Sequence, residues 1–150
     1  MKKFLVTGCG SLLGQGIIRT ISSSNKNYEI FGTEYIKDTV GLYWVKKAYI
    51  LPDILKEKVS LNSWYLKILK IIKRHKINYL IPGLDFELPI LNQIKSKIEK
   101  NTKCKIIISD KKVINICRDK WNTSEFLRKN NFVYPNSCLP KNLKFFFKKK

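Results

Sequence analysis

Apolar residues along this chain fall into two patterns, short continuous runs and longer stretches with a helical repeat. The continuous runs have the length of buried β-strands and lie at 3–7, 28–33, 48–51, 78–81 and 105–109. The helical repeats lie at 14–21, 62–76 and 88–98, and two shorter helical segments are expected at 110–117 and 123–129. Strands that alternate with helices predict an α/β fold, a Rossmann-like doubly wound parallel sheet of about five strands.

The segment after the first strand is rich in glycine, at positions 8, 10, 14 and 16. Glycines allow a tight turn there, and the N-terminus of the following helix offers free N–H groups to an anion. Ser11 is expected to cap that helix, and Glu34 ends the second strand, where an acidic residue can hold a ribose hydroxyl. Gly8, Gly10, Ser11 and Glu34 are therefore candidate nucleotide-binding residues. An alternative of equal weight is that the glycines only shape a strand–turn–helix corner.

The glycine loop departs from the best-known motifs. The dinucleotide fingerprint needs a glycine where this chain has Leu13, and the P-loop lysine and Ser/Thr are absent. Tyr43 and Lys47 have the spacing of the short-chain dehydrogenase pair, but they precede the third strand, so we interpret the match as chance. Cys9 has no histidine that the sequence places beside it, so we expect a small loop residue rather than a nucleophile.

The charge of the chain invites a nucleic-acid interpretation. Thirty Lys and Arg residues against eleven Asp and Glu residues make the formal net charge +19. The basic residues are spread along the whole chain, however, and only four are arginine, the preferred group for bidentate phosphate and base contacts. We therefore favour a solvated lysine surface and expect no specific nucleic-acid partner.

Cysteine usage and hydropathy limit the remaining classes. The four cysteines form no C-x-x-C pair and the chain has one histidine, so no metal site is expected. No apolar run reaches the roughly 18–20 residues of a membrane span, and the N-terminal run is shorter than the roughly 7–15 residues of a signal peptide core. We expect no membrane partner and place the protein in the cytoplasm.

Several segments, in their order and spacing, resemble the N-terminal part of ATP-grasp enzymes, specifically the carbamoyl-phosphate synthase large-subunit-like proteins. The similar segments are 4–16, 30–34, 79–88 with its D-x-E-L sequence, 116–127 and 135–137. The resemblance implies a pre-ATP-grasp domain of Rossmann-like fold over 1–112, a helical segment leading into an ATP-grasp domain over 113–138, and a tail over 139–150.

The resemblance also implies a reaction, in which ATP phosphorylates a carboxylate and an amine displaces the phosphate. ATP and magnesium are the cofactors of the intact family, and a small carboxylate is its substrate. By the same resemblance Lys120 is a candidate ATP contact. Without the resemblance, the lysine-rich composition of the chain favours a surface lysine there. Asp85 and Glu87 are weak substrate-binding candidates, because this turn borders the family's cleft. The residues themselves favour a helix cap for Asp85.

The chain lacks parts that an intact member of the family has. The phosphate-binding lysine, the glycine-rich flap and the magnesium ligands of the ATP-grasp region are absent from the sequence. We therefore assign no catalytic residue, and we expect these 150 residues to lack ligase activity alone and not to bind ATP and magnesium productively. The run at 145–150 suggests a truncated or frameshifted reading frame, or half of a split enzyme.

Four functions remain open at this point. The first is the substrate-side domain of such a ligase, with a separately encoded ATP-grasp chain or a second copy of itself as partner. The alternative is a free-standing NAD(P)- or nucleotide-sugar-binding Rossmann domain. The others are a basic nucleic-acid binder and a structural protein that docks on an ATP-grasp chain through an apolar patch at Phe145–Phe147.

Overall fold

The computed structural model describes the chain over residues 1–148, apart from the side chains of Phe145, Phe146 and Lys148. The apolar patch expected at Phe145–Phe147 therefore falls largely outside the described side chains. Contacts between residues divide the chain into two compact units, Met1–Ile108 and Ser109–Lys150.

The first unit is built on a parallel sheet. Its described strands are β1 (Lys2–Thr7), β2 (Tyr28–Glu34), β3 (Lys47–Ile50), β4 (Tyr79–Pro82) and β5 (Lys105–Ile106). They pair in the order β3-β2-β1-β4-β5, and every pair is parallel. The prediction of an α/β, Rossmann-like parallel sheet of about five strands is confirmed. The last strand is shorter than the apolar run suggested, because pairing with β4 ends at Ile106.

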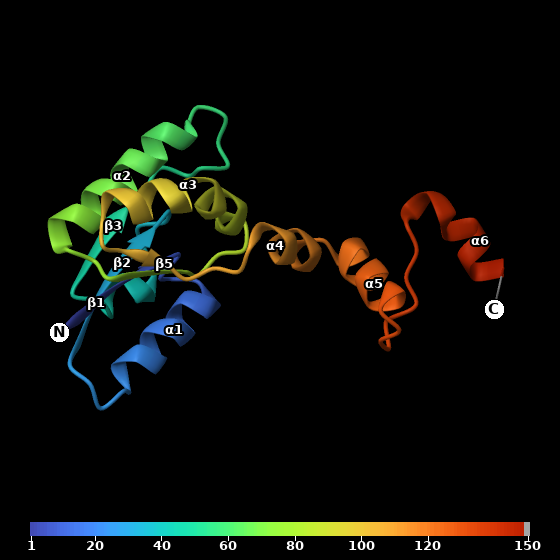
Figure 1. Cartoon of the computed structure of the whole chain (residues 1–150), viewed down its shortest axis with the longest axis horizontal. Helices are drawn as coiled ribbons and strands as arrows, with labels where there is room; N and C mark the ends of the chain where they lie inside the picture. Colours follow the sequence, from blue (N-terminus) through green and yellow to red (C-terminus); the bar gives the residue numbers. More distant parts are fainter. Residues whose placement is uncertain (149–150) are drawn as a thin grey trace. The chain divides into compact units, whose positions relative to one another are not determined.

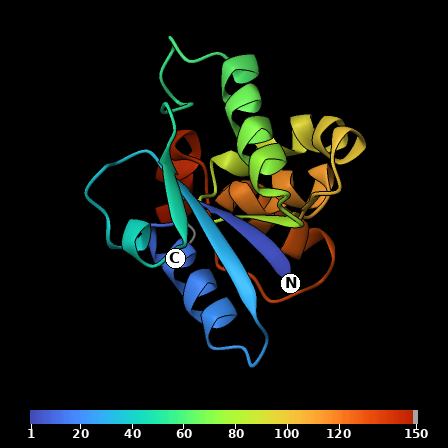
Figure 2. The same cartoon turned by 90° about the vertical axis from the view of Figure 1, so that its left-hand side faces the viewer.

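Helices cover both faces of this sheet (Figures 1 and 2). They are α1 (Leu12–Ser22) on one face, and α2 (Leu61–His75) and α3 (Glu87–Asn101) on the other. Val6 and Ile30 pack with Ile18 of α1, whereas Leu5 and Phe31 belong to the larger core beneath α2 and α3. Neighbouring strand residues enter different cores because successive side chains point to opposite faces. A short 3-10 helix, η1 (Val40–Tyr43), precedes β3.

The second unit is helical and has little buried surface. Its elements are α4 (Lys111–Arg118), α5 (Lys120–Lys129), η2 (Pro140–Asn142) and α6 (Leu143–Lys148). Asp110 caps α4 by accepting a bond from Val113 N–H, and Asp119 caps α5 through Asn122 N–H. The cap at Asp119 starts α5 three residues before the expected position. Over residues 1–148, the helices lack the combined length and hydropathy that crossing a bilayer requires.

Candidate functional site

Three segments meet where the strands of the sheet end: the loop at 8–11 after β1, Glu34 and Tyr35 at the end of β2, and the turn at 83–87 after β4. Hydrogen bonds link the three segments directly. Ligands of open parallel sheets bind outside the carboxyl ends of the strands, at the point where strand order reverses. In this sheet that point lies between β1 and β4. We call this region the carboxyl edge and treat it as the candidate site.

The glycine loop is held tightly against the β4 turn. Gly8 has φ +56°, and a Cβ there would stand 2.4 Å from Leu84 Cγ, so the position requires glycine. The Ser11 hydroxyl accepts a bond from Gly14 N–H at 2.9 Å and donates to the Gly83 carbonyl at 2.8 Å. The expected N-cap is thus confirmed, and the same hydroxyl also ties the loop to β4.

Glu34 turns its carboxylate inward onto the loop backbone. Its side chain is buried, with Oε2 accepting from Gly10 N–H at 2.7 Å and Oε1 from Tyr35 N–H at 2.8 Å. This carboxylate takes an N–H that a phosphate would need and would repel an anion beside it. Carboxylate oxygens keep further lone pairs, so a bond to a ribose hydroxyl stays a prediction. The hydroxyls of Thr33 and Thr39 are buried without a protein hydrogen-bond partner.

Glu87 forms a buried polar network that sequence reasoning missed. Its side chain is fully buried; Oε1 accepts from the Tyr35 hydroxyl at 2.7 Å and Oε2 from the Thr7 hydroxyl. Tyr35 in turn accepts a bond from Trp64 Nε1–H at 3.2 Å. Burial raises the pKa of Glu87 to about 7, against the lowering effect of bonds from Thr7 and Tyr35. Burial also raises the pKa of Tyr35, so its hydroxyl stays protonated and donates.

The turn before α3 places its two acidic residues differently. Asp85 is exposed, whereas Glu87 is enclosed by the protein, so a contact between Glu87 and a ligand would require the network to open. The expectation that Asp85 caps the helix is wrong, because α3 begins at Glu87 and Phe86 occupies the N-cap without a side-chain bond. Backbone bonds from Glu87 N–H to Leu84 and from Leu88 N–H to Asp85 close this turn instead. The substrate-binding role of both acids stays a prediction.

Cys9 fills the core of the glycine loop. Its side chain is buried beside Val6 and Ile18, and burial raises its pKa to about 12. A thiol held in this form is a poor nucleophile. Cys9 thus lies in the loop after β1, as expected, with its side chain in the core.

The carboxyl edge gathers Gly8, Gly10, Ser11 and Glu34. Lys120 is the exposed first residue of α5 and belongs to the second unit, so its contact with ATP stays a prediction. In residues 1–148, no group of three or more His, Cys, Asp or Glu side chains could hold a metal ion. Mg²⁺ is usually bound through one or two carboxylates together with substrate phosphates, and at the carboxyl edge Glu34 and Glu87 are already engaged while Asp85 is exposed.

Comparison with known proteins identifies similar folds. No protein-family model and no curated protein matches the chain. The biotin carboxylase domain of a single-chain bacterial carboxylase matches 99% of this chain and 34% of its own, with TM-score 0.60 and 11% identity. The biotin carboxylase domain dimer of Hydrogenobacter thermophilus 2-oxoglutarate carboxylase, in complex with MgADP, ADP and bicarbonate, matches 85% and 27%, with TM-score 0.55 and 16% identity.

A protein of another class also shares the sheet. dTDP-glucose 4,6-dehydratase from Bacillus anthracis, in complex with NAD, matches 71% of this chain and 36% of its own, with TM-score 0.50 and 14% identity. The chain thus spans about a third of the length of these three solved structures. Identities this low show the fold alone, which is the Rossmann-like, pre-ATP-grasp-like fold of the N-terminal domains of such carboxylases.

Proposed function

We propose, with this pre-ATP-grasp-like fold as the premise, that the chain is the N-terminal, substrate-side domain of an ATP-grasp carboxylate–amine ligase resembling the carbamoyl-phosphate synthase large subunit. The observation that carries the proposal is the match of 99% of the chain to a biotin carboxylase domain. The carboxylase bound to MgADP and bicarbonate supports ATP, magnesium and a small carboxylate as the ligands of the whole enzyme.

In this proposal the 150 residues have no ligase activity on their own. Of the carboxylates at the carboxyl edge, Glu34 is engaged by backbone N–H groups and Glu87 by two hydroxyls, whereas Asp85 is exposed. We propose that a catalytic ATP-grasp domain supplies the remaining magnesium ligands and the phosphate-binding cations. That domain would come from a further part of the enzyme or from a separately encoded chain.

The carboxyl edge has apolar side chains suited to contact with such a domain. Leu12 is 90% exposed and Leu13 55% exposed at the start of α1, and Ile36 is 63% exposed just after β2. Exposed apolar side chains that gather at a site edge are typical of protein–protein contacts. We propose that the catalytic domain docks here, where it would close the candidate site.

The first experiment is to sequence the gene through and beyond the codon for Lys150. An ATP-grasp reading frame downstream, with its phosphate-binding lysine and magnesium carboxylates, would support the proposal. ADP formation from ATP, Mg²⁺ and bicarbonate is then measured for the purified chain, alone and mixed with the product of that frame. We expect activity only in the mixture, and less of it with Leu12→Ser than with the control Leu66→Ser, an exposed residue of α2. ADP formation by the chain alone, or no ADP formation in the mixture, would contradict the proposal.

The second candidate function is a free-standing NAD(P)- or nucleotide-sugar-binding domain. It is supported by the fold shared with the NAD-bound dehydratase and by Glu34 at the end of β2. Under this alternative, added NAD(P) raises the melting temperature of the chain, and Glu34→Gln reduces that increase. Under the ligase proposal, NAD(P) leaves the melting temperature of both proteins unchanged.

A further inference from the structure

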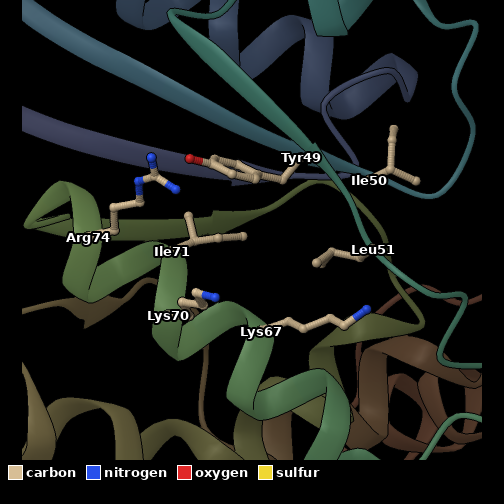
Figure 3. Close-up of a pocket in the computed structure, with 7 residues that line it drawn as sticks. All are labelled: Tyr49, Ile50, Leu51, Lys67, Lys70, Ile71 and Arg74. Carbon is tan, nitrogen blue, oxygen red and sulfur yellow. The ribbon is translucent and has the colours of Figure 1, made fainter.

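A second site lies between the edge strand β3 and helix α2. A pocket of about 220 Å³ opens there, lined by Tyr49, Ile50, Leu51, Lys67, Lys70, Ile71 and Arg74 (Figure 3). All seven residues belong to the first unit, and none is a candidate residue of the carboxyl edge. The pocket combines an apolar lining with three cationic side chains.

The cations of this pocket share one side of α2. Lys67, Lys70 and Arg74 follow one another at intervals of three and four, so they project from the same helix face. Within the described residues none of these three cations forms an ion pair. The ion pairs there join Glu29, Glu99 and Glu125 to other cations. Like charges this close repel each other, and a bound anion would relieve that repulsion.

The apolar side of the pocket is already formed. Leu51 is 4% exposed and Ile71 is 5% exposed, so both are fixed in the core, and Ile71 extends from α2 toward β3 (Figure 3). The Tyr49 hydroxyl is hydrogen-bonded to His75 Nε2, which orients the tyrosine ring at the pocket wall. The ring and the two aliphatic side chains offer a surface for a flat apolar group.

We propose that this pocket binds a small organic anion, a molecule with a flat apolar body and a carboxylate or phosphate group. The apolar body would lie against Leu51, Ile71 and the Tyr49 ring. Arg74 would bind the anionic group through two N–H donors, a geometry that suits carboxylate and phosphate, and the lysines would add charge. The volume of about 220 Å³ is below the roughly 300–1,000 Å³ of pockets for drug-sized ligands, so the ligand is small. This site is independent of the proposed ligase function.

Calorimetry measures the binding of phenyl phosphate and of benzoate to the full chain and so tests the proposal. Inorganic phosphate and phenol separate the contribution of the charge from that of the ring. Arg74→Gln is compared with Lys73→Gln, which removes the same charge from an exposed position of α2 outside this pocket. We expect at least one aromatic anion to bind more tightly than either fragment, and Arg74→Gln to weaken it about tenfold while Lys73→Gln changes it less than about twofold.

Three results would overturn the proposal. The first is that neither aromatic anion binds. The second is that inorganic phosphate binds as tightly as phenyl phosphate. The third is equal loss in Arg74→Gln and Lys73→Gln, which indicates attraction to general positive charge. In that case a single-stranded oligonucleotide that binds more tightly than phenyl phosphate would identify the surface as a polyanion contact. Whichever of phenyl phosphate and benzoate binds more tightly shows whether the anionic group is phosphate or carboxylate.

Discussion

The buried carboxyl group of Glu87 should make the stability of this protein depend on pH. Its side chain is fully buried, and burial raises its pKa from 4.5 to about 7. Because the folded pKa lies above the unfolded one, the protonated form favours the folded state. The contribution of Glu87 to stability is fully present below about pH 4.5, decreases as the pH rises toward 7, and changes no further above it.

The size of this effect follows from the two pKa values. The difference between about 7 in the folded state and 4.5 in the unfolded state corresponds to about 3 kcal/mol of unfolding free energy. Glu87→Gln keeps a neutral group of similar shape, much like the protonated carboxyl, and cannot ionise. We therefore expect the variant to gain about 3 kcal/mol over the wild type between pH 4.5 and 7.

Urea unfolding of both proteins at intervals from pH 4 to 8 measures this gain. Subtracting the two curves removes the titration of every other group, because those groups are common to both proteins. Asp85→Asn is the matched control, since it removes a neighbouring carboxylate that is exposed. A wild-type minus variant difference that stays constant across this range, or one that Asp85→Asn reproduces, would refute the reasoning.

Two further predictions follow from contacts at the carboxyl edge. Tyr35→Phe should cost about 1–3 kcal/mol, because Trp64 Nε1–H loses its acceptor and the buried carboxylate loses a donor. It should also move the pH-dependent loss of stability upward, since this bond lowers the pKa of that carboxyl group; urea curves with an unchanged pH range would contradict it. Gly14→Ala should destabilise by about 1–3 kcal/mol because its Cβ would stand 2.2 Å from the Gly8 carbonyl oxygen, whereas Gly16→Ala has open space and should stabilise α1 by up to about 1 kcal/mol. Thermal melts of the two variants check the pair, and equal melting temperatures would count against the close packing of the loop.

The elements of the fold were predictable because each depends on a local pattern. Buried parallel strands appear as short apolar runs, and helices as repeats of three to four residues. The predicted strands and helices therefore lie within about three residues of the observed ones. Ser11 could be predicted as a cap because capping joins a side chain to backbone only three positions away.

The cap at Asp85 could not be predicted correctly for the same local reason. Asp85 has the right chemistry for a helix start, but two backbone hydrogen bonds of the turn delay α3 to Glu87. The packing of β4 and α3 determines such a turn, and the spacing of residues along the sequence carries no information about that packing. Glu34 was correctly placed at the end of β2, yet its partners Gly10 and Tyr35 depend on how the loop folds back.

The sequence alone determined the α/β architecture, the glycine corner after β1 and the positions of the candidate loop residues, because all of these follow from neighbours along the chain. Tertiary structure decided which groups became partners. Thr7 and Tyr35 reach Glu87, and Trp64 reaches Tyr35, only after three strands and two helices have packed, over separations of up to 80 residues. The pocket beside β3 likewise requires α2 to pack next to that strand. Burial and charge pairing are properties of three-dimensional proximity, so the raised pKa of Glu87 and the unpaired cations of α2 became visible only in the folded chain.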